Sequence, residues 1–442
     1  AAYRISEEPF FEPLRKAVDN LKIRLSYGSL GNQQIGYYDF IQTITTKGSM
    51  SDYSFDGTVL GQHATVSDPV SGDQTWEKVV SKNLGLDLNM FNNRLSLTTD
   101  FYIRDTKGIL GKGKSLPSIY GASEPQMNAN NLRTKGYELV LGWRDSFKLA
   151  GSTFSYGITG TFSDYTAEYT KCDNPTGLIG DPYVGKKYGE IWGYKVDGLF
   201  RNDKEAAEYA SRIDLSTVAS GYYTATGAYG KGVRGGDIKY LDLNGDNIVN
   251  GGKGTLDDPG DRRVIGNSSP RYQYGASLNF SWYGFDVSVF MQGIGRLDWY
   301  PGADNLRFWG PYCRPYATFV PKNFMSQVWS EENPDAYFPR ARAYTSLNSN
   351  SGTAYYTNDR YLQNLAYCRL KNLTIGYTIP RRLTSKVGIK ECRIYFSGEN
   401  LATWSALKSD FLDPEQAAAD SDKKANVYPW CKTYSIGLNL TF

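Results

Sequence analysis

The chain has almost no histidine and no closely spaced cysteines, which argues against several classes of catalytic and metal site. His63 is the single histidine among 442 residues, and the five cysteines lie far apart without a CxxC pair. Histidine is the most frequent general acid or base, and closely spaced cysteines and histidines are typical of zinc sites. We therefore expect that the protein is not an enzyme and has neither a zinc site nor a disulfide framework.

Long hydrophobic runs and a strong excess of one charge are also missing. No stretch approaches the roughly 18 consecutive apolar residues of a transmembrane helix, and the residues after Ala1 do not resemble a signal peptide. The formal net charge is +3, whereas nucleic-acid binders usually carry a strongly basic face. We expect no nucleic-acid partner. A barrel strand is still allowed, because it crosses a membrane with about 9–11 residues, half of them polar.

Residues 432–442 show the clearest pattern that the chain does contain. Apolar and polar side chains alternate there, and the apolar set is Tyr434, Ile436, Leu438, Leu440 and Phe442. This period of two predicts a strand with one apolar and one polar face. Ending on an aromatic residue in the apolar register is typical of the closing strand of an outer-membrane barrel.

Similar alternation recurs along the chain, and the connections between the segments are alternately short and long. Short turns are expected at Asn92-Asn93, 145–152, Tyr283-Gly284 and 380–390, and long loops at 30–80, 106–132, 166–270, 294–365 and 403–430. Outer-membrane barrels have short periplasmic turns and long extracellular loops. We predict an all-β, transmembrane antiparallel barrel with about ten strands here and a partial strand at Ala1. A soluble β-sandwich has the same periodicity and is the alternative.

Several motifs, in this order, resemble the carboxy-terminal half of SusC-like (RagA-like) TonB-dependent transporters of Bacteroidota. They include LKIRLSYGSLGN (21–32), NLRTKGYELVLGW (131–143), YLDLNGDNIVN (240–250), RIYFSGENLATWS (393–405) and SIGLNLTF (435–442). The resemblance extends over the whole chain. It is informative about the family and says little about the substrate.

The resemblance implies a plugged outer-membrane barrel of roughly 22 strands, of which residues 1–442 form the carboxy-terminal part of a single barrel domain. The amino-terminal plug, the TonB box and the first strands are then expected to be absent from this chain. Implied partners are a SusD-like lipoprotein, the TonB complex acting through the missing part, the remaining barrel and plug polypeptide, and lipid or lipopolysaccharide.

The function that the resemblance implies is active import of large nutrients, an oligosaccharide or an oligopeptide, energised by TonB and assisted by the lipoprotein. A single-component TonB-dependent receptor for a metal chelate or vitamin is one alternative. A surface glycan-binding β-protein is an alternative from another class. No cofactor is required for any of these functions.

Two sets of candidate residues follow from the expected barrel. The polar face would line the lumen, and its candidates are Arg24, Asp100, Arg104, Glu138, Asn279, Arg393 and Glu399. These side chains would contact the plug, or they would form only a hydrated wall. The long loop at 294–365 supplies aromatic candidates for substrate contact, namely Trp299, Tyr300, Phe308, Trp309 and Tyr312. Exposed rings suit sugars or apolar peptide side chains, but loop self-packing or docking of the lipoprotein is the alternative.

A calcium site is a further candidate in the loop 242–261. Asp242, Asn244, Asp246 and the carbonyl of Ile248 match the opening positions of an EF-type calcium loop. The second half of that motif fails, because Lys253 occupies the position of the bidentate glutamate. A loop held by Asx turns is the alternative to bound Ca²⁺.

Overall fold

A computed structural model describes most of the chain. The described residues are 1–32, 41–47, 54–55, 58–59, 63–72, 74–112, 117–224, 232–313, 316, 320–342, 345–347, 352–409, 411–419 and 428–442. No helix in these ranges combines the length and apolar character needed to cross a bilayer.

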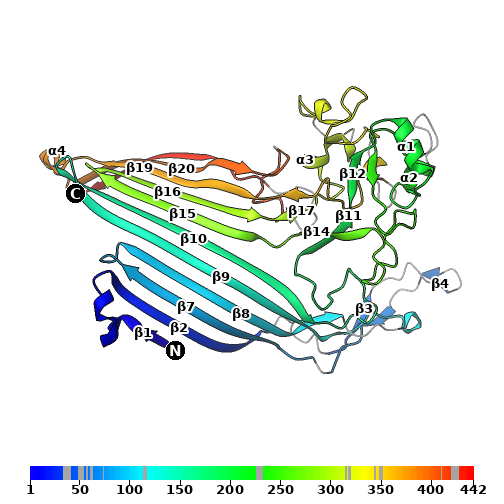
Figure 1. Cartoon of the computed structure of the whole chain (residues 1–442), viewed down its shortest axis with the longest axis horizontal. Helices are drawn as coiled ribbons and strands as arrows, with labels where there is room; N and C mark the ends of the chain where they lie inside the picture. Colours follow the sequence, from blue (N-terminus) through cyan, green and yellow to red (C-terminus); the bar gives the residue numbers. More distant parts are fainter. Residues whose placement is uncertain are drawn as a thin grey trace.

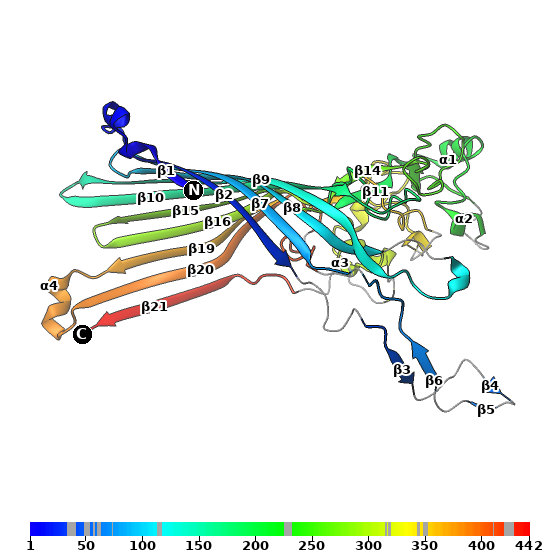
Figure 2. The same cartoon turned by 90° about the horizontal axis from the view of Figure 1, so that it is seen from below.

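An antiparallel sheet of eleven strands dominates the structure (Figures 1 and 2). In spatial order its strands are β1 (Ala2–Arg4), β2 (Val18–Asn32), β7 (Glu77–Met90), β8 (Leu95–Lys112), β9 (Gln126–Leu149), β10 (Ser152–Lys171), β15 (Arg271–Trp282), β16 (Phe285–Arg296), β19 (Tyr367–Thr378), β20 (Glu391–Ser405) and β21 (Thr433–Thr441). Spatial order follows chain order throughout, with β1 and β21 at the two edges. The strand count matches the sequence prediction.

The alternating sequence puts the apolar residues on one exposed face of this sheet. Leu84 pairs with Phe101, which pairs with Tyr137 on the next strand, and these side chains keep 47%, 55% and 36% of their surface exposed. At the carboxy-terminal edge Ile436 is 85% exposed. A soluble sandwich would bury such a face against a second sheet, since apolar burial is its main stabilising force. The exposure favours contact with lipid.

Short turns join the strands at one end of the sheet. Ala150-Gly151 and Tyr283-Gly284 are two-residue turns in which both residues have positive φ, as type I′ hairpins require. The turn expected at 145–152 is therefore too long, because β9 and β10 stay paired up to Leu149 and Ser152. The turn at 380–390 contains α4 (Arg381–Thr384) and the 3-10 turn η7 (Ser385–Val387). The other short 3-10 turns of this end are η1 (Ile5–Glu7) and η2 (Pro9–Leu14).

The long connections lie at the opposite end of the sheet and contain regular structure (Figure 1). Their strands are β3 (Ile44–Lys47), β4 (Ser54–Phe55), β5 (Thr58–Val59), β6 (His63–Val66), β11 (Glu190–Tyr194), β12 (Val196–Leu199), β13 (Ile238–Tyr240), β14 (Arg262–Asn267), β17 (Asp298–Trp299) and β18 (Gln363–Asn364). Their helices and 3-10 turns are η3 (Ser118–Tyr120), α1 (Asp203–Ala210), α2 (Ser220–Thr224), α3 (Leu306–Trp309), η4 (Gly310–Tyr312), η5 (Met325–Gln327) and η6 (Thr345–Leu347).

Described residues of 172–270, 297–366 and 406–419 share one hydrophobic core, and we call them the loop domain. Its fully buried side chains include Phe200, Tyr240, Trp309 and Tyr361. The largest apolar cluster therefore lies beyond the end of the sheet rather than on it. The long loops expected from the sequence are present, but three of them fold together as a compact unit.

Candidate functional site

The polar face of the sheet is hollow, as a barrel lumen would be. A cavity of about 760 Å³ lies over β9, β10, β15 and β16, at the end with the short turns. Its walls include the polar positions Arg144, Ser155, Asn279, Ser281 and Asp286. We call it the wall cavity. It opens toward solvent over these polar positions.

Arg24 holds three strands together on this polar face. Its Nε donates to Oδ2 of Asp87 at 2.9 Å, and its Nη2 donates to Oδ2 of Asp100 at 2.8 Å. Asn83 also donates to Asp100, at 2.7 Å. Gly85 lies between Arg24 and Asp100 in the strand register, and a Cβ at this position would lie 2.5 Å from the guanidinium carbon. The missing side chain lets the arginine cross the middle strand.

A second arginine uses the same device on the other half of the sheet. Arg393 of β20 reaches over β19 to Asp286 of β16, with Nε to Oδ1 at 2.9 Å. A Cβ on Gly376 of β19 would lie 2.5 Å from the Arg393 guanidinium and 2.6 Å from the Asp286 carboxylate. Three of the predicted lumen residues, Arg24, Asp100 and Arg393, are thus already neutralised by partners in the wall itself.

Strand register places the remaining lumen candidates on the same polar face. Glu138 faces Asp100 across β8 and β9, and Asn279 contributes to the wall cavity. The Arg104 guanidinium lies 5.8 Å from the centre of the Tyr102 ring. Glu399 pairs in register with Thr433 of β21. Contact with a plug stays a prediction for all of these residues.

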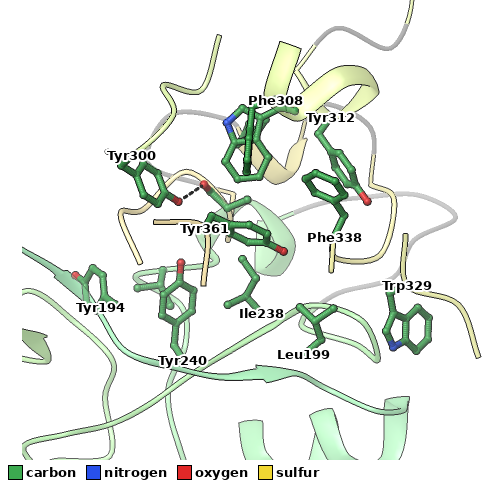
Figure 3. Packing of buried hydrophobic residues seen from close by; sticks show 14 of the residues in the cluster. Tyr194, Leu199, Ile238, Tyr240, Tyr300, Phe308, Tyr312, Trp329, Phe338 and Tyr361 are labelled. Atoms are coloured by element: carbon green, nitrogen blue, oxygen red, sulfur yellow. Dashed lines mark hydrogen bonds between the residues drawn. The ribbon is translucent and has the colours of Figure 1, made fainter. Parts of the chain in front are cut away.

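The aromatic candidates for substrate contact lie in the loop-domain core rather than on a surface, and Figure 3 shows Tyr300, Phe308 and Tyr312 there. Their exposed fractions are only a few per cent, for Trp299, Tyr300, Phe308, Trp309 and Tyr312 alike. The expectation of exposed rings is wrong for the five, because all belong to one core. Phe308, Trp309 and Tyr312 pack against other rings there, and the hydroxyl of Tyr300 donates to backbone carbonyls. Trp309, for example, is fully buried with its ring centre 5.0 Å from that of Tyr361. Whether any of them contacts a substrate stays a prediction.

The polar groups inside this core are connected by hydrogen bonds. Asn358 is fully buried and donates to the hydroxyl of Tyr300 at 3.1 Å and to the carbonyl of Tyr356 at 2.9 Å. Tyr222 is hydrogen-bonded to Thr353 at 3.1 Å, and burial raises the pKa of Tyr222 to about 12. Satisfied buried networks of this kind specify one arrangement of a core. The loop domain is accordingly a defined structure.

A buried ion pair joins two segments of the loop domain. Nη2 of Arg342 donates to Oδ2 of Asp237 at 2.6 Å, and both side chains are at most 3% exposed. The guanidinium also lies 4.1 Å from the centre of the Tyr222 ring. Burial raises the pKa of Asp237, and the neighbouring Arg342 opposes this shift. The pair is needed structurally, because either charge alone would be costly in this core.

A second cavity lies where the loop domain meets the sheet, and we call it the rim cavity. Its volume is about 720 Å³, which is within the range of small-molecule sites. It is lined by residues of β11, of the β16 to β17 junction and of the segment 355–357. They include Glu190, Trp192, Asp298, Trp299, Tyr300, Tyr355 and Thr357. Of the five aromatic candidates, Trp299 and Tyr300 contribute to this cavity.

Sequence reasoning missed a charge cluster that fastens the last long loop to the sheet. Arg369 of β19 is 3% exposed, and its Nη2 donates to Oδ1 of Asp413 at 2.8 Å. Its Nη1 donates to Glu415 at 2.7 Å, and Lys371 donates to the same carboxylate at 2.8 Å. Residues so far apart in the chain leave no spacing signal. The only signal for Arg369 in the sequence is the alternation of apolar and polar residues around it. A bulge between Leu370 and Asn372 interrupts this alternation.

The proposed calcium ligands are occupied by hydrogen bonds within their own loop. Asp242 accepts from the backbone N–H groups of Gly245 and Asn247, at 2.7 and 2.9 Å. Asp246 accepts from the N–H of Ile248, and Asn244 from that of Asp246. Within the described ranges, no three His, Cys, Asp or Glu side chains converge in a way that could hold a metal. The arrangement fits the Asx-turn alternative, and calcium binding stays a prediction.

Asp261, the last carboxylate of this loop, has a structural position. It is fully buried, and its two oxygens accept from the N–H groups of Leu243 at 2.7 Å and Asn250 at 2.9 Å. The carboxylate therefore ties the start of the loop to its middle.

Comparison with known proteins gives a consistent set of similarities. No protein-family model matches the chain. A TonB-dependent receptor of Formosa agariphila is 27% identical over 463 residues, which cover 100% of this chain and 42% of that protein. The TonB-dependent receptor SusC of Bacteroides thetaiotaomicron is 22% identical over 452 residues, covering 100% and 39%. The chain thus spans about two fifths of the length of the curated relatives it matches.

Solved structures show the same partial correspondence. The RagAB peptide transporter matches with a TM-score of 0.69 at 21% identity, over 100% of this chain and 43% of that chain. The same importer in an open-open state matches with a TM-score of 0.67 at 22% identity. At this identity the likeness is evidence for the fold. It confirms the predicted antiparallel barrel architecture and excludes the sandwich.

Proposed function

Because this chain is a SusC-like relative of the TonB-dependent receptors and an outer-membrane β-barrel protein, we propose that the whole protein is a nutrient importer. In this proposal residues 1–442 form the carboxy-terminal part of one barrel domain. The remaining strands, the plug and the TonB box belong to the rest of the protein. The proteins that the chain resembles are receptors and transporters rather than enzymes.

The observation that carries this proposal is the chemical difference between the two faces of the sheet. Apolar residues such as Phe101 and Ile436 are left exposed on one face, whereas Arg24 and Arg393 are paired on the other. Charges in a lumen are tolerated, while a charge on the lipid face costs about 2–4 kcal/mol at the membrane centre. The wall suits lipid outside and a hydrated interior.

Completion of the barrel by further strands is supported by the sheet edges. Among the described residues, β1 and β21 are the two edges of the sheet and do not pair with each other. Each backbone group left unpaired in hydrocarbon costs several kcal/mol. Strands from the rest of the protein would pair with these edges, and the wall cavity would receive the plug.

We infer a large nutrient as the cargo, either an oligopeptide or an oligosaccharide. The rim cavity lies beside the loop domain and combines aromatic rings of Trp192 and Tyr355 with the carboxylates of Glu190 and Asp298. Both cargo classes offer apolar surfaces to rings and hydrogen-bonding groups to carboxylates. The RagAB protein, whose fold this chain shares, is a peptide transporter, and this likeness favours an oligopeptide.

A SusD-like lipoprotein is the partner that we propose for the loop domain. Leu178, Val184, Tyr188 and Leu256 are exposed on this domain, and a backbone hydrogen bond from Leu256 to Gly177 brings two of their segments together. An exposed apolar patch usually marks a contact surface. A single-component receptor for a metal chelate or vitamin is the alternative, and it predicts no lipoprotein.

The test is uptake by cells that carry or lack the gene, with fluorescent oligopeptides and oligosaccharides of matched size. We expect TonB-dependent uptake of one class, a decrease with Tyr355→Ala, and a surface lipoprotein that co-purifies in detergent. Uptake of neither class, or uptake that is independent of TonB, would overturn the importer. Uptake with no lipoprotein in the purified complex would favour the single-component alternative.

A further inference from the structure

One short turn differs from the others in charge and length. Residues 380–390 contain Arg381, Arg382, Lys386 and Lys390 and no acidic residue. The two-residue turns at Ala150-Gly151 and Tyr283-Gly284 carry no charge at all. The turn lies at the end of the sheet opposite the loop domain, beside the carboxy terminus (Figure 1). In an outer-membrane barrel this end is periplasmic.

The turn is helical, and its apolar and basic side chains lie on different sides of the helical segment. Helix α4 and η7 form a continuous helical segment from Arg381 to Val387, closed by Gly388 with φ of 79°. Leu383 and Val387 are four residues apart, as are Arg382 and Lys386, so each pair shares a side of the segment. Leu383 and Val387 are 53% and 71% exposed. Two large apolar groups therefore project from the segment beside its cations.

The basic residues of the turn are available for an external anion. Among the described residues, none of Arg381, Arg382 and Lys386 forms an ion pair. Lys390 is committed differently, because its Nζ donates to the backbone carbonyl of Phe442 at 2.7 Å. The turn is held in place by the N–H of Ile389, which donates to the carbonyl of Thr384 at 3.2 Å. Three cations thus remain on a defined segment.

The depth of the turn relative to the membrane follows from an aromatic pair. The rings of Phe285 and Tyr377 lie with their centres 4.6 Å apart near the end of the apolar face. Aromatic girdles of barrels lie at the level of the lipid headgroups. Pro380 follows Tyr377 by three residues, about 10 Å of extended chain. The cations are consequently within reach of the phosphate groups of the periplasmic leaflet.

We propose that the segment 381–387 is a binding site for an anionic phospholipid of the periplasmic leaflet. Arg381, Arg382 and Lys386 bind the headgroup phosphate, and Leu383 and Val387 insert among the upper acyl carbons. Arginine suits this role, since its planar guanidinium binds phosphate through two hydrogen bonds. Basic clusters beside a membrane-spanning segment attract anionic headgroups in the same way. The site is independent of the cargo and of the import mechanism.

Native mass spectrometry of the whole detergent-extracted protein, titrated with phosphatidylglycerol, tests the proposal. Neutralising the site with Arg381→Gln, Arg382→Gln and Lys386→Gln together is expected to weaken lipid retention at least tenfold, given about fivefold per charge. Matched neutralisation of Lys187, Lys204 and Lys253 in the loop domain should leave retention unchanged. These lysines are also exposed but lie at the other end of the molecule.

Two further arms keep the result interpretable. Arg381→Lys with Arg382→Lys preserves the charge and should retain most of the lipid, and Leu383→Asn with Val387→Asn should reduce retention without changing charge. Soluble glycerol phosphate should not displace the lipid. The proposal is overturned if the triple glutamine variant, verified as folded, retains phosphatidylglycerol as the parent does. It is also overturned if glycerol phosphate alone competes fully.

Discussion

Arg24 and Asp100 lie on strands that are not neighbours, and yet the Arg24 guanidinium makes two hydrogen bonds to the Asp100 carboxylate, at 2.9 and 2.8 Å. The intervening strand contributes Gly85 at the point of crossing. A pair of this type spans three strands at once. It fixes their mutual register more firmly than pairs between adjacent strands.

Filling the crossing point should break the pair. Gly85→Ala would put a methyl group 2.5 Å from the guanidinium carbon, which forces Arg24 away and leaves Asp100 half-buried without its cation. We expect the free energy of unfolding in urea to fall by about 1–3 kcal/mol. Gly28→Ala is the matched control. Gly28 lies on the neighbouring strand β2, on the same face as Arg24, and no atom lies within 4 Å of its new Cβ. Equal effects of the two substitutions would show that the crossing is unimportant.

Removing the central ring of the loop domain should unfold that domain and spare the sheet. Trp309 is fully buried, and truncating a buried tryptophan to alanine costs about 3–5 kcal/mol. Trp309→Ala should therefore make the loop domain sensitive to protease while the barrel stays resistant. Tyr316→Ala removes an aromatic ring that is 84% exposed in the same loop, and it should have no such effect. A protease-resistant Trp309→Ala protein would mean that the core is redundant.

The loop domain should lose stability at alkaline pH. Burial raises the pKa of Tyr222 and of Tyr337 to about 12, whereas a tyrosine in the unfolded chain titrates near 10. Between these values the folded state binds more protons than the unfolded state, so stability falls as pH rises from 10 to 12. The loss is about 1.4 kcal/mol per tyrosine and pH unit. Urea unfolding at several pH values, with tyrosinate absorbance, measures it. Tyr222→Phe should reduce the dependence of the free energy of unfolding on pH. Ionisation of Tyr222 and Tyr337 near pH 10 in the folded protein would contradict the prediction.

Removal of Arg369 alone should release the last long loop from the sheet. Arg369→Met leaves the buried Asp413 without its cation, while Lys371 still pairs with Glu415, and an unpaired buried charge costs about 3–5 kcal/mol. Hydrogen exchange of residues 411–419 should accelerate strongly. Adding Asp413→Asn to this variant, with Glu415 kept as the partner of Lys371, should restore much of the protection. Fast exchange in both variants would point to lost packing rather than to charge.

The loop 242–261 should depend on its own carboxylates more than on a bound metal. Asp261→Ala removes a buried acceptor of backbone N–H groups, and we expect a loss of about 2 kcal/mol in loop-domain stability. A chelator should leave the melting temperature of the parent protein unchanged. A large decrease with chelator, reversed by Ca²⁺, would establish the calcium site that the DLNGDN motif suggests.

The strands could be predicted because their signal is local. In β7 and β8 the apolar residues recur at every second position. The turn expected at Asn92-Asn93 is present but longer than predicted, because it includes Phe91 and Arg94, and Phe91 has a positive φ like the two asparagines. The longer pairing of β9 and β10 was not predicted, because Asp145 and Ser146 interrupt the apolar pattern. Their backbone groups still continue the ladder.

The site was predicted only in part, because its contacts are distant in sequence. Alternation puts Arg24 and Asp100 on the same face, but their contact depends on the register of three strands and on Gly85. The aromatic loop residues looked exposed, since nothing in the sequence around Trp309 indicates that Phe338 and Tyr361 pack beside it. Burial of a loop residue is decided by partners from other loops.

The small ladder between β11 and β14 has a consequence for the order in which the protein assembles. β10 and β15 are neighbours in the sheet although roughly a hundred residues separate them, and closing so long a connection is entropically unfavourable. Pairing of Glu190 with Asn267 bridges most of that excursion. Once it forms, the remaining connection is about a fifth as long, and the cost of closing it falls by about 1.4 kcal/mol. We therefore expect that pairing of β11 with β14 before the wall is complete would favour the pairing of β10 with β15.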